Sequence, residues 1–188
     1  FRSPERFPVM RMQWVEGPTL GRFVQDACRR EDIGSIKWVR EELEKMRAHL
    51  KEHGVAHGDL SAENVVINTA GQSPEIKLVD YDSMWLAEVG DLETSAGIGP
   101  LQHPKRTNPI GSTADEMAFE IFDLALAYLE TQPASGCTSD AFDKQFVIST
   151  RDLVQSTSFR IATTIEQLEP ELFVRAKTYA EGPDRKST

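Results

Sequence analysis

The middle of the chain places three polar side chains around two short β-rich segments. Asp59 and Asn64 lie in HGDLSAEN, and Asp80 follows IKLV. The segments VVIN and IKLVDY, joined by TAGQSPE, are typical of a β-hairpin, in which the start of the first strand lies beside the end of the second. We therefore expect Asn64 and Asp80 to be neighbours, with Asp59 projecting from the preceding loop. Two carboxylates and an amide oxygen would suit Mg²⁺, a hard ion that prefers oxygen ligands.

Two helices are predicted before this region, and they would position it. The first has apolar residues at the spacing of one helical face, namely Leu20, Phe23, Val24 and Ala27. For the second, Ser35 is the expected N-cap and Gly54 the expected left-handed residue after its end. Its apolar stripe consists of Ile36, Val39, Leu43, Met46 and Leu50.

The flanking segments complete an α+β chain in which helices dominate. A strand is predicted from Pro8 to Trp14, and residues 86 to about 112 read as an extended loop. Residues 113–131 predict a helix that is apolar over most of its surface and therefore buried. In the tail, 138–188, the pattern indicates weaker helices, which Pro170 should break or kink.

Composition restricts the classes of partner. The chain has 21 basic and 30 acidic residues, a formal net charge of −9, which argues against general affinity for nucleic acid or a membrane surface. No apolar run is long enough to span a bilayer. Cys28 and Cys137 lack metal-ligand spacing and predict two reduced thiols in a cytoplasmic protein. Because the chain begins at Phe1, we expect a fragment of a longer protein.

The spacing Asp-x-x-x-x-Asn, a hairpin and a further Asp resembles the catalytic and metal-binding loops of kinases. HGDLSAEN resembles the kinase catalytic loop H-R-D-L-x-x-x-N, and VDYD resembles the D-F-G motif. VMRMQWVEG is similar to the last small-lobe strand and hinge, TADEMAFEIFDLALAYLE to the central large-lobe helix, and LQHPKR to the end of the activation segment. More narrowly, the chain resembles bacterial kinase-like proteins over residues 8 to about 131.

The resemblance implies a protein-kinase-like fold and divides the chain accordingly. Residues 1–17 would form the last small-lobe strand and the hinge, and residues 18–188 a mainly helical large lobe with a catalytic-loop hairpin. The small lobe would be largely absent from this chain. Within the large lobe, the implied parts are the catalytic loop 57–64, the metal loop 80–82, the activation-type segment 83–112 and the central buried helix 113–131.

The resemblance also implies roles on the phosphate side of an ATP site. Asp59 would orient the attacking hydroxyl or accept its proton, and Asn64 and Asp80 would hold the Mg²⁺ that bridges the ATP phosphates. His57 and Asp115 would give structural support, with Asp115 bracing the catalytic loop.

On the adenine side, the resemblance assigns four residues. The backbone of Gln13 and Val15 would hydrogen-bond the adenine edge. Met12 would be the gatekeeper, and Val66 would lie under the ring. These positions follow from the hinge-like segment and from the first hairpin strand.

Three substitutions distinguish this chain from the common kinase pattern. Gly58 replaces the Arg that typically pairs with a phosphorylated activation loop, Ser61 replaces a Lys that contacts the γ-phosphate, and Asp82 stands where Gly is usual. The first expectation is an ATP- and Mg²⁺-dependent kinase acting on Ser/Thr hydroxyls of a protein substrate. A small-molecule hydroxyl acceptor, as in aminoglycoside and choline kinases, is one alternative. A pseudokinase that acts as a nucleotide-binding or scaffolding module is another.

Overall fold

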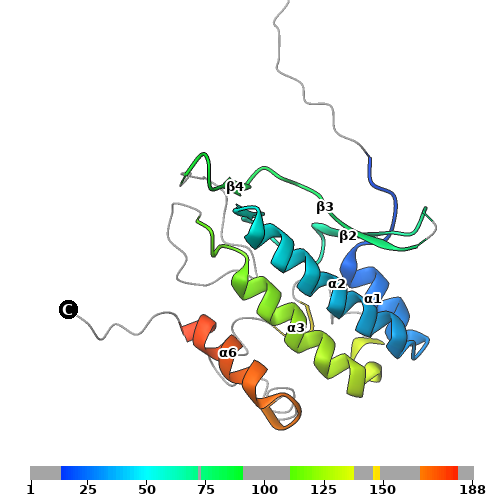
Figure 1. The fold of residues 1–188 in the computed structure, drawn as a ribbon. Helices are drawn as coiled ribbons and strands as arrows, with labels where there is room; N and C mark the ends of the chain where they lie inside the picture. The colour runs from blue at the N-terminus through cyan, green and yellow to red at the C-terminus, as the bar shows by residue number, and fades with distance from the viewer. Residues whose placement is uncertain (1–13, 72, 91–110, 138–145, 149–165, 182–188) are drawn as a thin grey trace, which may run out of the picture.

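The computed structural model describes residues 14–71, 73–90, 111–137, 146–148 and 166–181. Helices α2 (Ile33–Glu52) and α3 (Glu116–Thr131) lie side by side at the centre, with α1 (Leu20–Arg29) against α2 and α6 (Pro170–Glu181) against α3 (Figure 1). A 3₁₀ helix, η1 (Pro133–Cys137), packs on α1. None of the described helices has the length and apolar character needed to cross a membrane.

Helix α2 buries the predicted stripe but begins earlier than predicted. Ile36, Val39 and Leu43 are buried, and Met46 and Leu50 pack against the same core at partial exposure. The prediction of Ser35 as N-cap was wrong. Asp32 caps the helix, because its carboxylate accepts the backbone N–H of Ser35 at 3.0 Å and the Ser35 hydroxyl at 2.7 Å. Gly54, at φ +61°, follows the end of α2 as predicted.

Helix α3 is the most deeply buried element described. Most of its side chains are inaccessible to solvent, which agrees with the predicted buried helix, although regular helix starts at Glu116 and not at residue 113. The residues just before it form a turn that ends in Asp115. This turn places a carboxylate at the end of α3 that lies nearest the loop region, and its contacts are described below.

The predicted hairpin is confirmed. Strands β2 (Val65–Asn68) and β3 (Glu75–Leu78) pair antiparallel, with Val65 opposite Leu78. A second sheet that was not predicted joins β1 (Val55–Ala56) to β4 (Trp85–Leu86). The segment before α1 attaches to the hairpin through the backbone bond from Ile67 N–H to the Pro18 carbonyl, at 2.9 Å. The hairpin is therefore fastened to the helices through α1.

Pro170 starts α6 at its first position, where the missing N–H costs no hydrogen bond, so the predicted break is confirmed. Of the strand predicted at 8–14, only Trp14 is described; it is outside any strand and 84% exposed. The part of the activation-type segment from 91 to 110 lies outside the described residues, as does most of the tail. Its described part, 83–90, contains β4.

Candidate functional site

His57 connects the loop after β1 to the end of the hairpin. The side chain is fully buried, and Nε2 donates to the backbone carbonyl of Val79 at 2.8 Å. Because Nε2 carries that proton, Nδ1 of the neutral ring is the acceptor, and it receives the backbone N–H of Asp59 at 3.4 Å. One imidazole thus links the backbone N–H of Asp59 to the backbone carbonyl of Val79, the residue before Asp80.

Asp115 holds the same loop from the opposite side. Its carboxylate is buried, and Oδ2 accepts the backbone N–H of His57 at 2.5 Å while Oδ1 accepts that of Gly58 at 2.9 Å. Hydrogen bonds to an ionised acceptor are stronger than neutral ones, so this pair ties the loop firmly to the start of α3. The structure therefore brings His57 and Asp115 together, in keeping with the loop-bracing position that the resemblance gave to Asp115.

Gly58 has a steric reason to be glycine. Its φ is +83°, in the left-handed region, and a Cβ built there would lie 2.0 Å from the carbonyl oxygen of Ser83. The backbone of the loop and the backbone after Asp80 approach too closely for any side chain. An Arg at this position, as in the kinase loop that the sequence resembles, would collide with the Ser83 carbonyl. The sequence did not indicate this contact.

Asp59 and Asn64 are joined across the loop. Nδ2 of Asn64 donates to the backbone carbonyl of Asp59 at 2.8 Å, and both residues are half-buried. The backbone N–H of Asn64 bonds Ser61 through its carbonyl, at 3.2 Å, and its hydroxyl, at 3.3 Å. Since the amide nitrogen of Asn64 points back into the loop, its Oδ1 is the atom that can serve an external ligand.

Asp80 lies beside Asn64, as the hairpin predicted. The backbone N–H of Val79 donates to the Asn64 carbonyl at 3.0 Å, which makes Asp80 the next residue beyond this pairing. Asp80 is exposed and has φ +66°, an unusual conformation for a residue with a side chain. Such conformations persist where the surrounding structure imposes them and are concentrated at functional sites. Asp82 is an exposed turn residue two positions further on.

The donor set of this region fits Mg²⁺ in type. Asp80 offers an exposed carboxylate and Asn64 an amide oxygen, and Mg²⁺ bound with a phosphate substrate takes one or two carboxylates plus phosphate and water oxygens. Among the described residues, the acidic side chains here do not form a set of three with donor atoms within 4.8 Å of each other.

The residues assigned to the adenine side are only partly visible. Met12 and Gln13 lie outside the described residues. Val15 is half-buried, and Val66 is buried in β2, where it also forms an isolated bridge with Thr19. The described residues place Val66 next to the loop that begins α1, and they leave its assignment under an adenine ring as a prediction.

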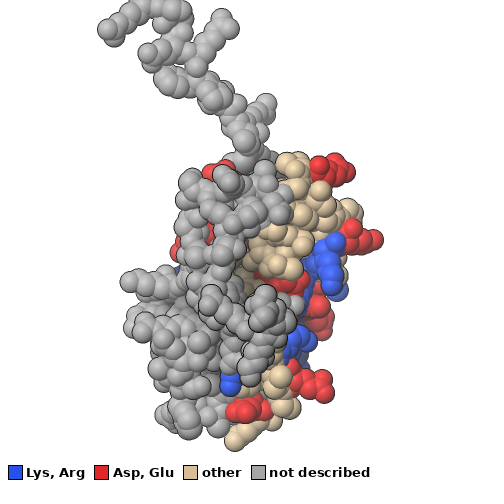
Figure 2. Space-filling view, turned by 90° about the vertical axis from the view of Figure 1, so that its left-hand side faces the viewer, with Lys and Arg blue, Asp and Glu red and all other residues tan. Residues whose placement is uncertain are grey.

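A groove of about 780 Å³ lies between α2, α3 and α6, away from the residues assigned to ATP. It is lined mainly by charged side chains, among them Arg40, Arg47 and Arg175, which form ion pairs with acids of α3. In Figure 2, basic and acidic side chains are interspersed over the visible described surface. Each of the three arginines is therefore paired with an acidic side chain of the protein.

The sequence reasoning missed two features. Ser83 is buried, and its backbone carbonyl lies close against Gly58. The sequence offers no local signal for this contact. His49, Glu52 and His53 bring their donor atoms together at the end of α2. Their spacing, His-x-x-Glu-His within a predicted helix, could have revealed this second feature, because residues three and four apart share a helix face.

No protein-family model matches the chain. The chain is similar to a curated protein of Mycosarcoma maydis named serine/threonine-protein kinase SMU1, with 33% identity over 102 residues. The matched region covers 54% of this chain and 11% of SMU1, so the chain spans about a tenth of the length of this relative. The similarity provides a partial relative that carries a kinase name.

Proposed function

We propose that this chain contributes the catalytic loop and metal loop of an ATP- and Mg²⁺-dependent phosphotransferase with a protein-kinase-like fold, acting on Ser/Thr hydroxyls of a protein. The main support is the arrangement of the loop at residues 57–64. Asp115 and His57 fix its backbone, and Asn64 is bonded to the Asp59 carbonyl and lies beside Asp80. The kinase name of the partial relative agrees with this assignment.

The proposed chemistry needs positioning more than covalent participation. Phosphoryl transfer is catalysed mainly by alignment of the acceptor and by neutralisation of developing charge. Asp59 would orient the acceptor hydroxyl and take its proton. Asn64 Oδ1 and the Asp80 carboxylate would hold the metal. When bound, Mg²⁺ supplies charge neutralisation at the phosphate oxygens.

The rigid attachment of the loop explains why these particular contacts would serve catalysis. Asp59 lies between Gly58, whose N–H is held by Asp115, and Asn64, which is bonded to its carbonyl. These contacts hold the main chain of Asp59, from which its carboxylate projects. We therefore expect the backbone at Asp59 to retain its position when substrate binds, so that reorganisation is limited to the side chain.

The first experiment is thermal denaturation of the full-length protein with and without Mg²⁺ and ATP. Stabilisation by Mg·ATP should disappear in Asp80→Ala, because a metal ligand is lost, and should persist in Glu88→Gln, which changes an exposed carboxylate after β4. Equal stabilisation of the wild type and Asp80→Ala would contradict the metal assignment. Absence of stabilisation in the wild-type protein would favour the scaffolding alternative.

The second experiment measures transfer of labelled γ-phosphate to Ser/Thr peptides and, separately, to aminoglycosides and choline. Asp59→Asn should lower the transfer rate by about 10²- to 10⁴-fold, the usual contribution of a general base, while Mg·ATP binding stays within about twofold. Full activity in Asp59→Asn would refute its role. Transfer only to the small alcohols would move the proposal to a small-molecule kinase.

A further inference from the structure

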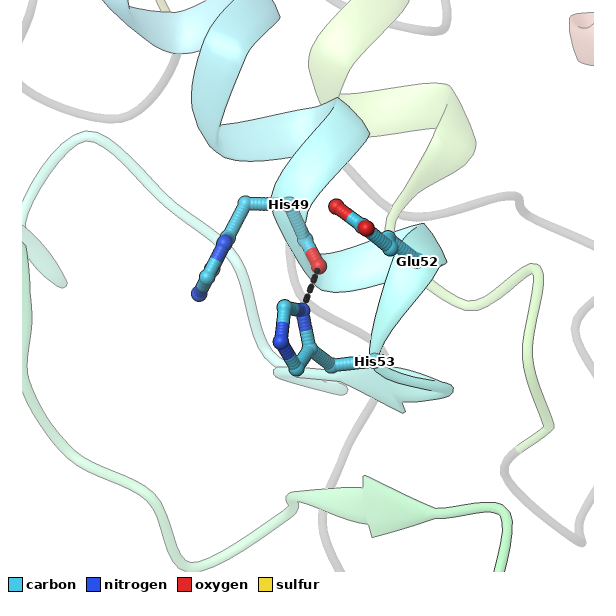
Figure 3. A group of neighbouring side chains, drawn as sticks. All are labelled: His49, Glu52 and His53. Atoms are coloured by element: carbon cyan, nitrogen blue, oxygen red, sulfur yellow. Dashed lines mark hydrogen bonds between the residues drawn. The ribbon is translucent and has the colours of Figure 1, made fainter.

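A second cluster of polar side chains lies at the opposite end of the β1 segment from the loop just described. His49, Glu52 and His53 come from the last turn of α2 and its C-cap, and all three are exposed (Figure 3). One donor atom from each residue lies within 4.8 Å of the others. Among the described residues, no other group of three or more His, Cys, Asp or Glu side chains has its donor atoms this close together.

The helix imposes the proximity. Residues three and four positions apart occupy the same face, and His49 is followed by Glu52 and His53 at these intervals. The two imidazole rings have their centroids 4.2 Å apart with an interplanar angle of 41°. The backbone that carries the three side chains is therefore already in place, and only exposed side chains need to turn for a common ligand to be bound.

A second observation concerns the orientation of His53. Its Nδ1 bonds the backbone carbonyl of His49 at 2.9 Å (Figure 3), and a carbonyl can only accept, so Nδ1 must carry the proton. In the neutral ring the lone pair is then on Nε2. Histidines that bind metal usually donate their other ring N–H to a carbonyl or carboxylate, which fixes the tautomer and the ring. His53 has this preparation before any metal is bound.

We propose that His49, Glu52 and His53 form a binding site for a divalent transition-metal ion of the Zn²⁺ type. Two imidazole nitrogens and one carboxylate oxygen are ligands that Zn²⁺ takes in tetrahedral sites, with water in the fourth position. Tetrahedral coordination at about 2.1 Å requires donor atoms about 3.4 Å apart, and donor atoms that already lie within 4.8 Å of one another can reach that separation by rotation of the exposed side chains. Mg²⁺ prefers oxygen ligands and is not expected to compete.

The position of the site gives the bound ion a structural consequence. Gly54 follows His53 directly, and its carbonyl accepts the backbone N–H of Ala87, beside β4, at 2.8 Å. An ion bound to His49 and His53 would prevent fraying of the last turn of α2. It would thereby hold the start of β1, the strand that leads to His57. The proposal does not depend on phosphotransferase activity.

The test is a titration of the metal-free, full-length protein with Zn²⁺ in competition with a chromophoric chelator. We expect one tight equivalent in the wild type. Loss of second-shell partners alone weakens metal sites by 10- to 100-fold, so His49→Gln and His53→Gln should each weaken binding by at least about tenfold. Glu52→Gln should weaken it in the same direction. Excess Mg²⁺ should not displace the ion.

Two control variants separate this site from adventitious binding. Glu41→Gln removes another exposed carboxylate of α2, and Cys137→Ser removes the exposed thiol; both should bind Zn²⁺ as the wild type does. Co²⁺ substitution should give the visible absorption of a nitrogen-ligated ion in the wild type, and the double variant His49→Gln/His53→Gln should lose it. Unchanged affinity in the double variant, loss of binding in Cys137→Ser, or a wild-type Kd weaker than about 1 mM would each overturn the proposal.

Discussion

The side chains of His57 and Asp115 act on main-chain atoms of the loop at 57–59. His57 bonds the Val79 carbonyl and the Asp59 N–H, and Asp115 receives two successive backbone N–H groups. Buried backbone donors need acceptors, and here one carboxylate supplies both. Asp115 is therefore the residue whose removal should disturb the loop most without touching any group assigned to ATP.

We predict that Asp115→Ala lowers the free energy of unfolding by about 2–4 kcal/mol, because two buried N–H groups lose a charged acceptor. Asp115→Asn should cost nearly as much, since its amide NH₂ would face one of the two N–H donors. Urea denaturation measures the change. Ser112→Ala, at an exposed position of the same turn, is the control and should differ from the wild type by less than about 0.5 kcal/mol.

Gly58 and Gly90 form a matched pair for testing the close approach to Ser83. Both have φ +83°, but a Cβ at Gly90 would meet nothing within 4 Å, whereas one at Gly58 would lie 2.0 Å from the Ser83 carbonyl oxygen. Gly90→Ala should therefore cost about 1 kcal/mol for the left-handed backbone alone. Gly58→Ala should cost at least about 2 kcal/mol more, because overpacking is added. Equal effects in urea denaturation would show that the loop can move away from Ser83.

At the residue scale, the sequence predicted the groups that meet but not the contact that restricts them. Asn64 and Asp80 could be placed from the strand pattern, because a hairpin brings the start of its first strand beside the end of its second, and Asp59 could be placed in the loop before it. The place of His57 came from the resemblance to the kinase catalytic loop. The approach of Gly58 to Ser83 joins two irregular segments, and no local periodicity reports on such a contact.

At the scale of the element, α2 depends on its cap. The hydrogen bond from the Ser35 hydroxyl, together with that from the Ser35 N–H, lowers the pKa of Asp32 below its usual value. A carboxyl whose pKa is lowered in the native state contributes stability above its unfolded value, about 3.9, and loses that contribution as the pH falls through the native value. The stabilisation of α2 by the cap is therefore complete at neutral pH.

We predict that Asp32→Ala lowers the free energy of unfolding by about 1 kcal/mol at pH 7. The difference from the wild type should shrink as the pH falls below about 3.9 and through the lower native pKa, because the carboxylate is protonated first in the unfolded chain and then in the native one. Asp32→Asn keeps an acceptor and should lose less than Asp32→Ala. Urea denaturation over a series of pH values from 7 downward measures these differences. A pH-independent difference would show that the carboxylate charge does not contribute.

The first residue of α2 and the two short strands β1 and β4 were the hardest features to predict from the sequence. Both Asp32 and Ser35 are good N-cap residues, and the sequence alone does not decide between them, since Ile33 can begin the helix as well as Ile36. The strands β1 and β4 contain two residues each, so neither shows a period. They form because the end of α2 and the segment after Asp80 are brought together by the rest of the molecule.

At the scale of the whole molecule, charged groups join three helices at one place. Glu120 of α3 is completely buried and bonds Arg47 of α2 at 2.7 Å and Arg175 of α6 at 2.8 Å. Arg47 also pairs with Glu116. Burial alone would lower the pKa of Arg47, but hydrogen bonds with Glu116 and Glu120 outweigh burial and raise the pKa above its usual value. The guanidinium is therefore charged at any pH at which the protein folds.

We predict that Glu120→Gln lowers the free energy of unfolding by about 3 kcal/mol, because the guanidinium of Arg47, with 15% of its side chain exposed, then loses its fully buried carboxylate partner. Arg175 is 49% exposed, so the loss of its bond to Glu120 contributes less. Glu44→Gln is the matched control. Glu44 also pairs with Arg47, at 3.8 Å, but it is 68% exposed and should contribute less than about 0.5 kcal/mol. Urea denaturation in low and high salt compares the two variants. A loss below about 1 kcal/mol in Glu120→Gln would contradict a buried, energetically coupled network.

This network could not be predicted from the sequence. In the sequence, Glu120 stands as a charged residue within an apolar run, and its arginine partners lie 73 and 55 residues away along the chain. Apolar periodicity indicates which face of a helix is buried, but it carries no information on which distant charge will reach a polar residue on that face. Apolar periodicity therefore predicted the buried face of α3 and could not predict the partners of Glu120.

The hydrogen bond from His57 to the Val79 carbonyl affects which positions of this loop can vary during evolution. Every amino acid has this carbonyl, so a mutation that changes the side chain at position 79 leaves the acceptor intact, while most mutations at position 57 or 115 delete the bonding group itself. Natural variants of this protein should therefore drift among apolar residues at position 79 and stay fixed at positions 57 and 115. Selection on this loop would act at one partner of each bond and leave the other free to vary.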